Sequence, residues 1–144
     1  MVKTVRDVLR NKGGETFSVG TDTTVFAALE MMAREDIGAV LVMNGSRLVG
    51  ILSERDYARK VILKGLTSPK TTVGEIMTRT VYYARPEQTV EECMAVITEK
   101  RCRHLPVLDN EKLVGLVSIG DLVKASIAEK EFMIGQLENY IKGG

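Results

Sequence analysis

The stretch Leu48-Val-Gly-Ile-Leu-Ser-Glu-Arg-Asp56 recurs 65 residues later as Leu113-Val-Gly-Leu-Val-Ser-Ile-Gly-Asp121. The alignment extends without a gap from residues 22–62 onto 87–127, with 9 identities in 41 positions. Thr4-Val-Arg-Asp-Val-Leu9 is echoed by Thr72-Val-Gly-Glu-Ile-Met77 at a shift of 68, so the first copy has three more residues before its first strand. A repeat of this kind indicates two copies of one supersecondary unit.

Both copies predict the element order β-α-β-β-α. Apolar residues recur at helical spacing from Val25 and again over Val90–Lys100. Apolar strands flank the turn formers Asn44-Gly45 and Asp109-Asn110, which predicts a tight hairpin in each copy. Short β-type runs at Thr16–Val19 and Thr80–Tyr83 precede the helices. We therefore expect an α+β fold of two repeats packed with approximate twofold symmetry, with clefts where they meet.

The repeats divide the chain into four segments. The first repeat with its N-terminal segment occupies residues 1–66, a linker 67–71, the second repeat 72–127, and a C-terminal helical extension 128–144. Around this extension a 3–4 spacing, broken by Lys130, links Val123, Ile127, Ile134, Leu137 and Ile141. That pattern fits either a helix docked on its own module or a dimer contact.

Composition limits the classes of function. The chain has 20 Lys and Arg against 19 Asp and Glu, so no broad basic face for nucleic acid is expected. The longest apolar run, Ala39–Met43, is too short to span a bilayer, and the N-terminus lacks a secretory h-region. These features predict a cytoplasmic protein with no membrane partner.

The two cysteines predict neither a disulfide nor a metal site. Cys93 and Cys102 lie roughly 13 Å apart along the expected helix, beyond the reach of a disulfide. Together with His104 they lack an obvious fourth zinc ligand.

Taken together, the two Leu-Val-Gly stretches, Arg103-His-Leu-Pro-Val107 and Thr72–Met77 resemble a tandem cystathionine-β-synthase (CBS) domain pair, or Bateman module. The resemblance covers about residues 4–127 and is that of a stand-alone bacterial or archaeal CBS protein. It implies a non-enzymatic metabolite sensor for signal transduction that binds AMP, ADP, ATP, NAD or S-adenosylmethionine, with no obligatory cofactor. It also implies a homodimer and an effector protein that the sequence does not identify.

Each Ser-x-x-Asp motif, Ser53 to Asp56 and Ser118 to Asp121, lies between a strand and a helix. The spacing alone predicts a helix capping box. The resemblance implies that the aspartates hold the ribose of the ligand, with the serines nearby. Both can hold at once, because a carboxylate can accept two hydrogen bonds from vicinal hydroxyls while the serine caps the helix.

Cationic residues beside these motifs are candidates for phosphate binding, although a solvated charged face is the alternative: Arg55, Arg59, Arg103 and His104. Ile119-Gly120 stands where the first copy has Glu54-Arg55, so the two sites should differ, with more phosphate charge expected at the first. The adenine pocket candidates, for which plain core packing or strand surface is the alternative, are Thr16, Phe17, Ile37, Ala39, Thr80, Val81, Tyr83 and Pro106.

Three rival functions remain open at this point. The chain could be a structural or protein-interaction module with empty clefts, a nucleic-acid-binding protein, or an enzyme that uses bound NAD. The enzyme is disfavoured because His104, the single histidine, has no recognisable serine or cysteine partner, so no catalytic residue is predicted.

Overall fold

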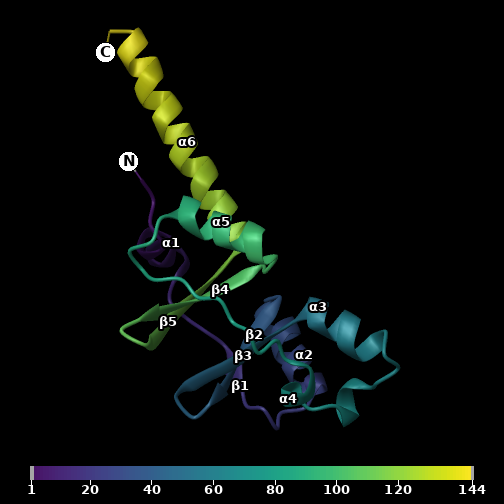
Figure 1. The fold of residues 1–144 in the computed structure, drawn as a ribbon. Coiled ribbons are helices and arrows are strands. Elements are labelled where there is room, and N and C mark those ends of the chain that lie inside the picture. The colour runs from purple at the N-terminus through teal and green to yellow at the C-terminus, as the bar shows by residue number, and fades with distance from the viewer. Residues whose placement is uncertain (1, 144) are drawn as a thin grey trace. The chain divides into compact units, whose positions relative to one another are not determined.

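The computed structural model describes residues 2–143, which divide into two compact units (Figure 1). We call Thr16–Tyr82 the first unit. The second unit combines the described residues up to Glu15 with those from Tyr83 onward. Each unit contains one of the two predicted hairpins and is described by itself.

The first unit is built on a three-stranded sheet in the order β1-β2-β3. The first strand is parallel to the second, and the second and third form the predicted antiparallel hairpin. Its elements are β1 (Ser18–Val19), α2 (Val25–Glu35), β2 (Ala39–Asn44), β3 (Arg47–Ser53), α3 (Glu54–Tyr57), the π-helical turn η1 (Ala58–Ile62), the 3₁₀ turn η2 (Ser68–Lys70) and α4 (Val73–Ile76).

The second unit repeats this plan with one strand fewer. Its elements are α1 (Val5–Lys12), α5 (Val90–Lys100), β4 (His104–Asp109), β5 (Lys112–Ser118) and α6 (Ile119–Ile141). Helix α5 has the predicted bounds, with Val90, Cys93 and Ile97 buried, and the predicted capping box of Thr89 and Glu92 is present. The mixed α and β fold is therefore confirmed, and so are both helices and both hairpins of the repeat.

The two hairpins match residue by residue. Ala39 faces Ser53 in the first, and His104 faces Ser118 in the second. A register shift interrupts each ladder at equivalent places, between Val42 and Met43 and between Val107 and Leu108. Each hairpin therefore delivers its serine and the following helix to the same place in its unit.

The predicted strand at Thr80–Tyr83 is wrong. Strand pairing in this part of the second repeat is a single parallel bridge, from Ala84 to Val107. The amide of Ala84 donates to the carbonyl of Pro106 at 2.9 Å, and the amide of Leu108 donates to the carbonyl of Ala84 at 2.9 Å. The β-type residues 80–83 lie just before Ala84, the residue that pairs with the hairpin, and form no strand themselves.

The short helices that precede the repeats are exchanged between the units. Helix α4, which precedes the second repeat in sequence, packs in the first unit, where Thr72 pairs with Thr24. Helix α1, at the N-terminus, packs in the second unit, where Thr4 pairs with Thr89. Grouping by contact thus differs from the division by sequence into 1–66 and 72–127.

Glycine in the Leu-Val-Gly motif permits this packing. A Cβ atom on Gly50 would lie 2.6 Å from the sulfur of Met77, and one on Gly115 would lie 2.6 Å from Cδ2 of Leu9. Real Cβ atoms do not approach so closely, so any other residue would force the side chain of Met77, which follows α4, or of Leu9, within α1, to move away from the strand. The motif is therefore explained first by close packing.

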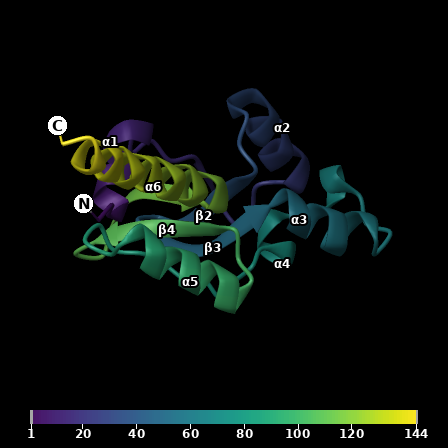
Figure 2. The same ribbon diagram turned by 90° about the horizontal axis from the view of Figure 1, so that it is seen from above.

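Helix α6 joins the second helix of the repeat and the C-terminal extension into one element of 23 residues. Its first half contacts α5 and α1, and Figure 2 shows α1 beside it. Its second half extends past the ends of α1 and α5 (Figure 1). None of the helices in the described part of the chain combines the length and apolar character that a bilayer crossing requires.

Candidate functional site

Both Ser-x-x-Asp motifs form capping boxes. The amide of Asp56 donates to the hydroxyl of Ser53 at 3.1 Å, and the amide of Ser53 donates back to Oδ2 of Asp56 at 3.0 Å. The same reciprocal pair joins Ser118 and Asp121, at 3.1 and 2.9 Å. The capping interpretation is confirmed, and it leaves the second oxygen of each carboxylate to be accounted for.

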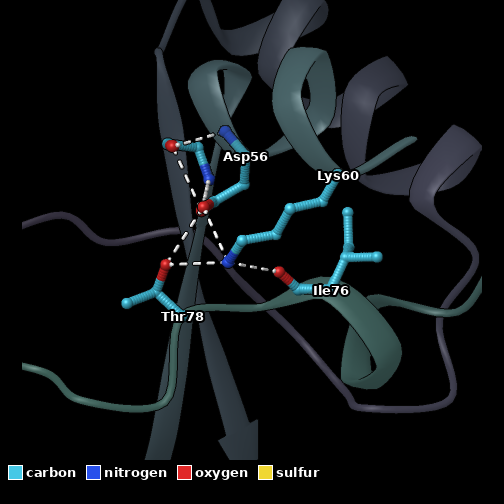
Figure 3. Close-up of polar contacts among 5 residues, drawn as sticks. Asp56, Lys60, Ile76 and Thr78 are labelled. Atoms are coloured by element: carbon cyan, nitrogen blue, oxygen red, sulfur yellow. Dashed lines mark hydrogen bonds and ion pairs between the residues drawn. The ribbon is translucent and has the colours of Figure 1, made fainter. Parts of the chain in front are cut away.

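The second oxygen of Asp56 is taken by the protein itself. The hydroxyl of Thr78 donates to Oδ1 at 3.0 Å, and the ammonium of Lys60 lies 3.2 Å from the same atom (Figure 3). The hydroxyl of Ser53 adds a bond to Oδ2 at 3.1 Å. With only 12% of its side chain exposed, Asp56 has hydrogen-bond partners on both oxygens. A carboxylate has about four acceptor positions, so this one is saturated.

The ammonium group of Lys60 likewise has a partner for every N–H donor. Its ammonium contacts Asp56, the carbonyl of Ile76 at 3.1 Å and the hydroxyl of Thr78 at 3.5 Å (Figure 3). An ammonium has three N–H donors, so no donor of Lys60 remains for a ligand. The network ties η1 to the end of α4, which is the packing role of this lysine.

Asp121 is held differently. Its Oδ2 accepts from the amide of Ser118 and from the ammonium of Lys12, which also donates to the carbonyl of Leu116 at 2.7 Å. Among residues 2–143, no hydrogen bond reaches Oδ1 of Asp121, and 26% of its side chain is exposed. The carboxylate of Asp121 therefore has an available oxygen, whereas that of Asp56 does not.

The pKa of Asp121 shows which interactions prevail. Burial acts to raise it, but the hydrogen bonds from Lys12 and Ser118, with the charge of Lys12, outweigh burial and lower the pKa below its usual value. The carboxylate is thus ionised at neutral pH, and a negatively charged acceptor forms the stronger hydrogen bonds with hydroxyl donors.

Lys12 is a site residue that sequence reasoning missed. It binds the carbonyl of Leu116, the repeat counterpart of Ile51, whose carbonyl accepts from the amide of Thr78 in the first unit. One flexible ammonium thus takes the place of a backbone amide and a hydroxyl. The available signal was the three-residue excess of the first copy, which falls at Asn11–Gly14 and includes Lys12.

The predicted phosphate-binding residues fall into two groups. Arg55 and Arg59 are exposed in the first unit, and Arg103 is exposed in the second. His104 is half-buried and lies close enough to Asp121 and Lys12 to feel both charges. Its repeat counterpart in the first unit is the buried, uncharged Ala39. The two sites are therefore chemically different.

The adenine candidates are also divided between the units. Thr16, Phe17, Ile37, Ala39, Thr80 and Val81 belong to the first unit, and Tyr83 and Pro106 to the second. Two of their backbone carbonyls already accept hydrogen bonds, that of Phe17 from Leu41 and that of Pro106 from Ala84. Ala39 and Pro106 are buried, whereas Thr80 and Tyr83 are exposed.

Neither thiol has the environment of a reactive group. Burial, with a contribution from Glu92, raises the pKa of Cys93 to about 11, and burial also raises the pKa of Cys102. Both cysteines are free thiols. Within residues 2–143, no three His, Cys, Asp or Glu side chains gather in a way that would hold a metal ion.

The single histidine offers a direct probe of Lys12. Burial lowers the pKa of His104 below 6.5, and the charge of Lys12 lowers it further, while Asp121 acts in the opposite direction. Lys12→Met should therefore raise the pKa of His104, measured from its ring signals in an NMR titration. His104 binds fewer protons when folded, so stability falls as pH drops below its unfolded pKa, and this loss should be smaller in the variant.

The control for this titration is Lys64→Met, at an exposed lysine of the first unit that does not act on His104. It should leave the histidine pKa where it is in the parent chain. A histidine pKa that falls or stays constant in Lys12→Met would contradict the arrangement of charges described above.

Comparisons with known proteins agree with this architecture. The sequence model of the CBS domain matches residues 5–63 and again 73–128. CBS domain-containing protein CBSX3, mitochondrial, from Arabidopsis thaliana is 38% identical over 150 residues, which cover 98% of this chain and 73% of that protein. The match to the family ends near the middle of α6, so the last turns of that helix lie outside it.

Solved structures show the same fold. A signal-transduction protein with CBS domains from Burkholderia ambifaria superposes with a TM-score of 0.85 at 50% identity, covering 88% of this chain and 95% of its own. A CBS domain pair in complex with 5′-methylthioadenosine and S-adenosyl-L-methionine superposes with a TM-score of 0.79 over 90% of this chain and 99% of its own. At 22% identity this second likeness shows the fold alone. The two family matches, the matching hairpins and the relatives together show that this chain belongs to the CBS-domain family, as a tandem pair of CBS domains.

Proposed function

We propose that this CBS pair is a regulatory sensor module that binds an adenosine-containing ligand, with the ribose held by Asp121. The observation that carries the proposal is the available Oδ1 of an ionised, partly exposed carboxylate at the start of α6. Vicinal ribose hydroxyls are two donors that such an oxygen can accept. Ser118 keeps its capping bond meanwhile, so ligand binding does not require the helix to lose its cap.

The Asp56 site should bind the same ligand class more weakly. A ribose there must displace the hydroxyl of Thr78 or the ammonium of Lys60, and both bonds are formed in the free chain. Arg55 and Arg59 remain the proposed phosphate contacts of this site, and Arg103 and His104 those of the Asp121 site. For adenine we keep the proposed walls of each unit, Thr16, Phe17, Ile37, Ala39, Thr80 and Val81 in the first, and Tyr83 and Pro106 in the second.

The ligand class is supported by the related CBS pair that was solved with two adenosine derivatives. AMP, ATP, NAD and S-adenosylmethionine share the adenosine group that the carboxylate would recognise, so the proposal names the group and leaves the remainder to experiment. Binding regulates an effector only if the ligand has a different affinity for two states of the module. One of the similar solved structures is a signal-transduction protein by name, which favours this over catalysis.

Thermal unfolding of the full chain with each of these four ligands tests the function. A ligand at 100 times its Kd adds about 2.7 kcal/mol to the free energy of unfolding, which raises Tm by several degrees in a chain of this size. We expect a clear rise with at least one of them. If all four leave Tm unchanged at millimolar concentration, the chain is not an adenosine sensor, and the interaction-module alternative replaces it.

We further propose that the module is a homodimer through the second half of α6. Ile127, Ile134 and Ile141 recur every seven residues with Leu137 between them, the spacing of a coiled-coil seam. Their exposed fractions are 53%, 55%, 80% and 61% for Ile127, Ile134, Ile141 and Leu137. The helix therefore does not bury this stripe on its own unit, and a second copy with the same stripe would cover it.

Leu137→Lys should convert the dimer to a monomer. A charge in the middle of the stripe cannot be buried against a second apolar stripe without a large cost. Light scattering after size-exclusion chromatography should give a mass near 15.9 kDa for this variant and about twice that for the parent chain. Gln136→Lys, one position away on the exposed side, is the matched control and should stay dimeric. Equal masses for Leu137→Lys and the parent would exclude this interface.

A further inference from the structure

The first unit has an apolar tip that its own core does not use. The tip consists of Ile62, Leu63 and Leu66, which lie at the end of η1 and before η2 and are 55%, 78% and 47% exposed. In Figure 1 it belongs to the teal turn that follows α3. We propose that this tip docks on an anionic lipid surface, where its aliphatic side chains enter the headgroup region and Lys64 and Lys70 face the anionic headgroups.

Backbone hydrogen bonds close the tip into a compact turn. The amide of Leu63 donates to the carbonyl of Ala58 at 3.2 Å, and the amide of Leu66 donates to the carbonyl of Val61 at 2.9 Å. Between them Gly65 has a φ of 72°, the left-handed conformation that lets the chain reverse. Val61 is 1% exposed and packs in the core of the unit. The core thus uses the valine and leaves the aliphatic side chains after it outside.

Positive charge without counter-charge accompanies the tip. Residues 57–74 include four cationic side chains and no acidic one. Lys60 is paired with Asp56, but among residues 2–143 neither Lys64 nor Lys70 has an ion-pair partner. Uncompensated cations attract an anionic partner.

The repeat shows that the fold does not require this tip. In the second copy the equivalent stretch, residues 122–139, has two lysines and three glutamates. Its backbone continues as the regular helix α6, with no reversal of the chain. The exposed aliphatic turn and its excess of positive charge therefore belong to the first copy alone.

The size and chemistry of the tip favour a lipid surface over a protein partner. Three side chains cover far less than the roughly 800 Å² that each partner contributes to a standard protein interface. Aliphatic side chains beside lysines are the combination that binds at the boundary between headgroups and acyl chains. Anionic headgroups supply the negative charge that attracts Lys64 and Lys70.

Such a contact lies at the membrane surface and needs no spanning segment. The expectation of no membrane partner rested on the absence of a long apolar run and on the balanced charge of the whole chain. Both are properties of the entire sequence, and a local cluster of exposed aliphatic and cationic side chains does not alter them.

Flotation of the full chain with lipid vesicles tests the proposal. One set of vesicles is phosphatidylcholine alone, and the other contains about one third phosphatidylglycerol, which is anionic. We expect binding to the anionic vesicles, about tenfold weaker binding to the neutral ones, and release at high salt because salt screens the attraction. Leu63→Asp and Lys64→Glu should each weaken binding to the anionic vesicles by about tenfold or more. Both residues are exposed, so the fold tolerates the changes.

The matched controls change the same chemistry elsewhere. Val2→Asp alters an exposed apolar residue of the second unit, and Arg47→Glu an exposed cation at the start of β3, and both should bind like the parent chain. The proposal is wrong if the chain does not bind anionic vesicles, binds both kinds equally, or binds as well in Leu63→Asp. Equal losses in Arg47→Glu and Lys64→Glu would also overturn it, because net charge alone would then explain binding. If vesicles are not bound and Leu63→Asp halves the mass in light scattering, a second copy covers the tip instead.

Discussion

Asp121→Ala is expected to abolish the rise in Tm that an adenosine ligand produces in the parent chain. The variant loses two hydrogen bonds from ribose hydroxyls to a charged acceptor, each contributing about 1.5–3 kcal/mol. Since 1.4 kcal/mol corresponds to a tenfold change in Kd, the affinity should fall by a hundredfold or more. The measurement is thermal unfolding with and without ligand, at the concentration that stabilises the parent chain.

The control is Asp109→Ala. Asp109 is an exposed aspartate of the same hairpin, at the end of β4, and takes no part in a capping box. It should retain the full rise in Tm. A ligand response in Asp121→Ala that equals the response of Asp109→Ala would place the ribose elsewhere.

Asp56→Ala is expected to have the opposite effect to Asp121→Ala: a large loss of folding stability with most of the ligand response retained. The side chain of Asp56 is 12% exposed and binds Ser53, Thr78 and Lys60. Truncation removes the carboxylate half of the capping box of α3, which accepts from the amide of Ser53, and leaves Lys60 without its counter-charge. Because the lysine is partly exposed and can reach water, we expect the free energy of unfolding to fall by about 2–3 kcal/mol, as measured by urea denaturation.

Asp121→Ala is the matched comparison, because it occupies the same motif position in the other repeat. Its carboxylate is more exposed and has fewer partners, so its loss should cost about 1 kcal/mol. Asp56→Ala should retain most of the ligand response. Equal destabilisation by the two substitutions would show that the difference between the two carboxylates has no energetic consequence.

Much of the fold was predictable because its determinants are local. Helical spacing and the capping box of Thr89 and Glu92 located α5, and turn formers located both hairpins. The strand expected at Thr80–Tyr83 failed for the converse reason, since pairing depends on which residue the hairpin contacts, and that residue is Ala84. Composition reports a preference for extended backbone and carries no information about the partner.

The sequences of α1 and α4 alone could not predict that each helix packs in the unit of the other repeat. Both have ordinary start signals, and nothing in their own sequences names the repeat that they contact. In the folded chain Met77, which follows α4, lies against Gly50, and Leu9 of α1 lies against Gly115. Close approach between segments far apart in the chain is a tertiary feature, visible only once both are in place.

In the candidate site, too, local features could be predicted from the sequence and contacts between distant residues could not. The Ser-x-x-Asp spacing identified both carboxylates, because a capping box joins residues three apart. The two carboxylates differ in their distant partners. Thr78, which binds Asp56, is 22 residues away from it, and Lys12, which binds Asp121, is 109 residues away. The prediction that the first site favours more phosphate charge stays untested.

Native mass spectrometry of the full chain with ATP and with AMP tests the central claim most directly, because it counts ligands on each chain. The account predicts one bound ligand per chain at the lowest concentrations, a second only at higher ones, and loss of the first in Asp121→Ala. No adduct with either nucleotide, or NAD or S-adenosylmethionine, at millimolar concentration would contradict it. So would an adduct that forms equally well in Asp121→Ala.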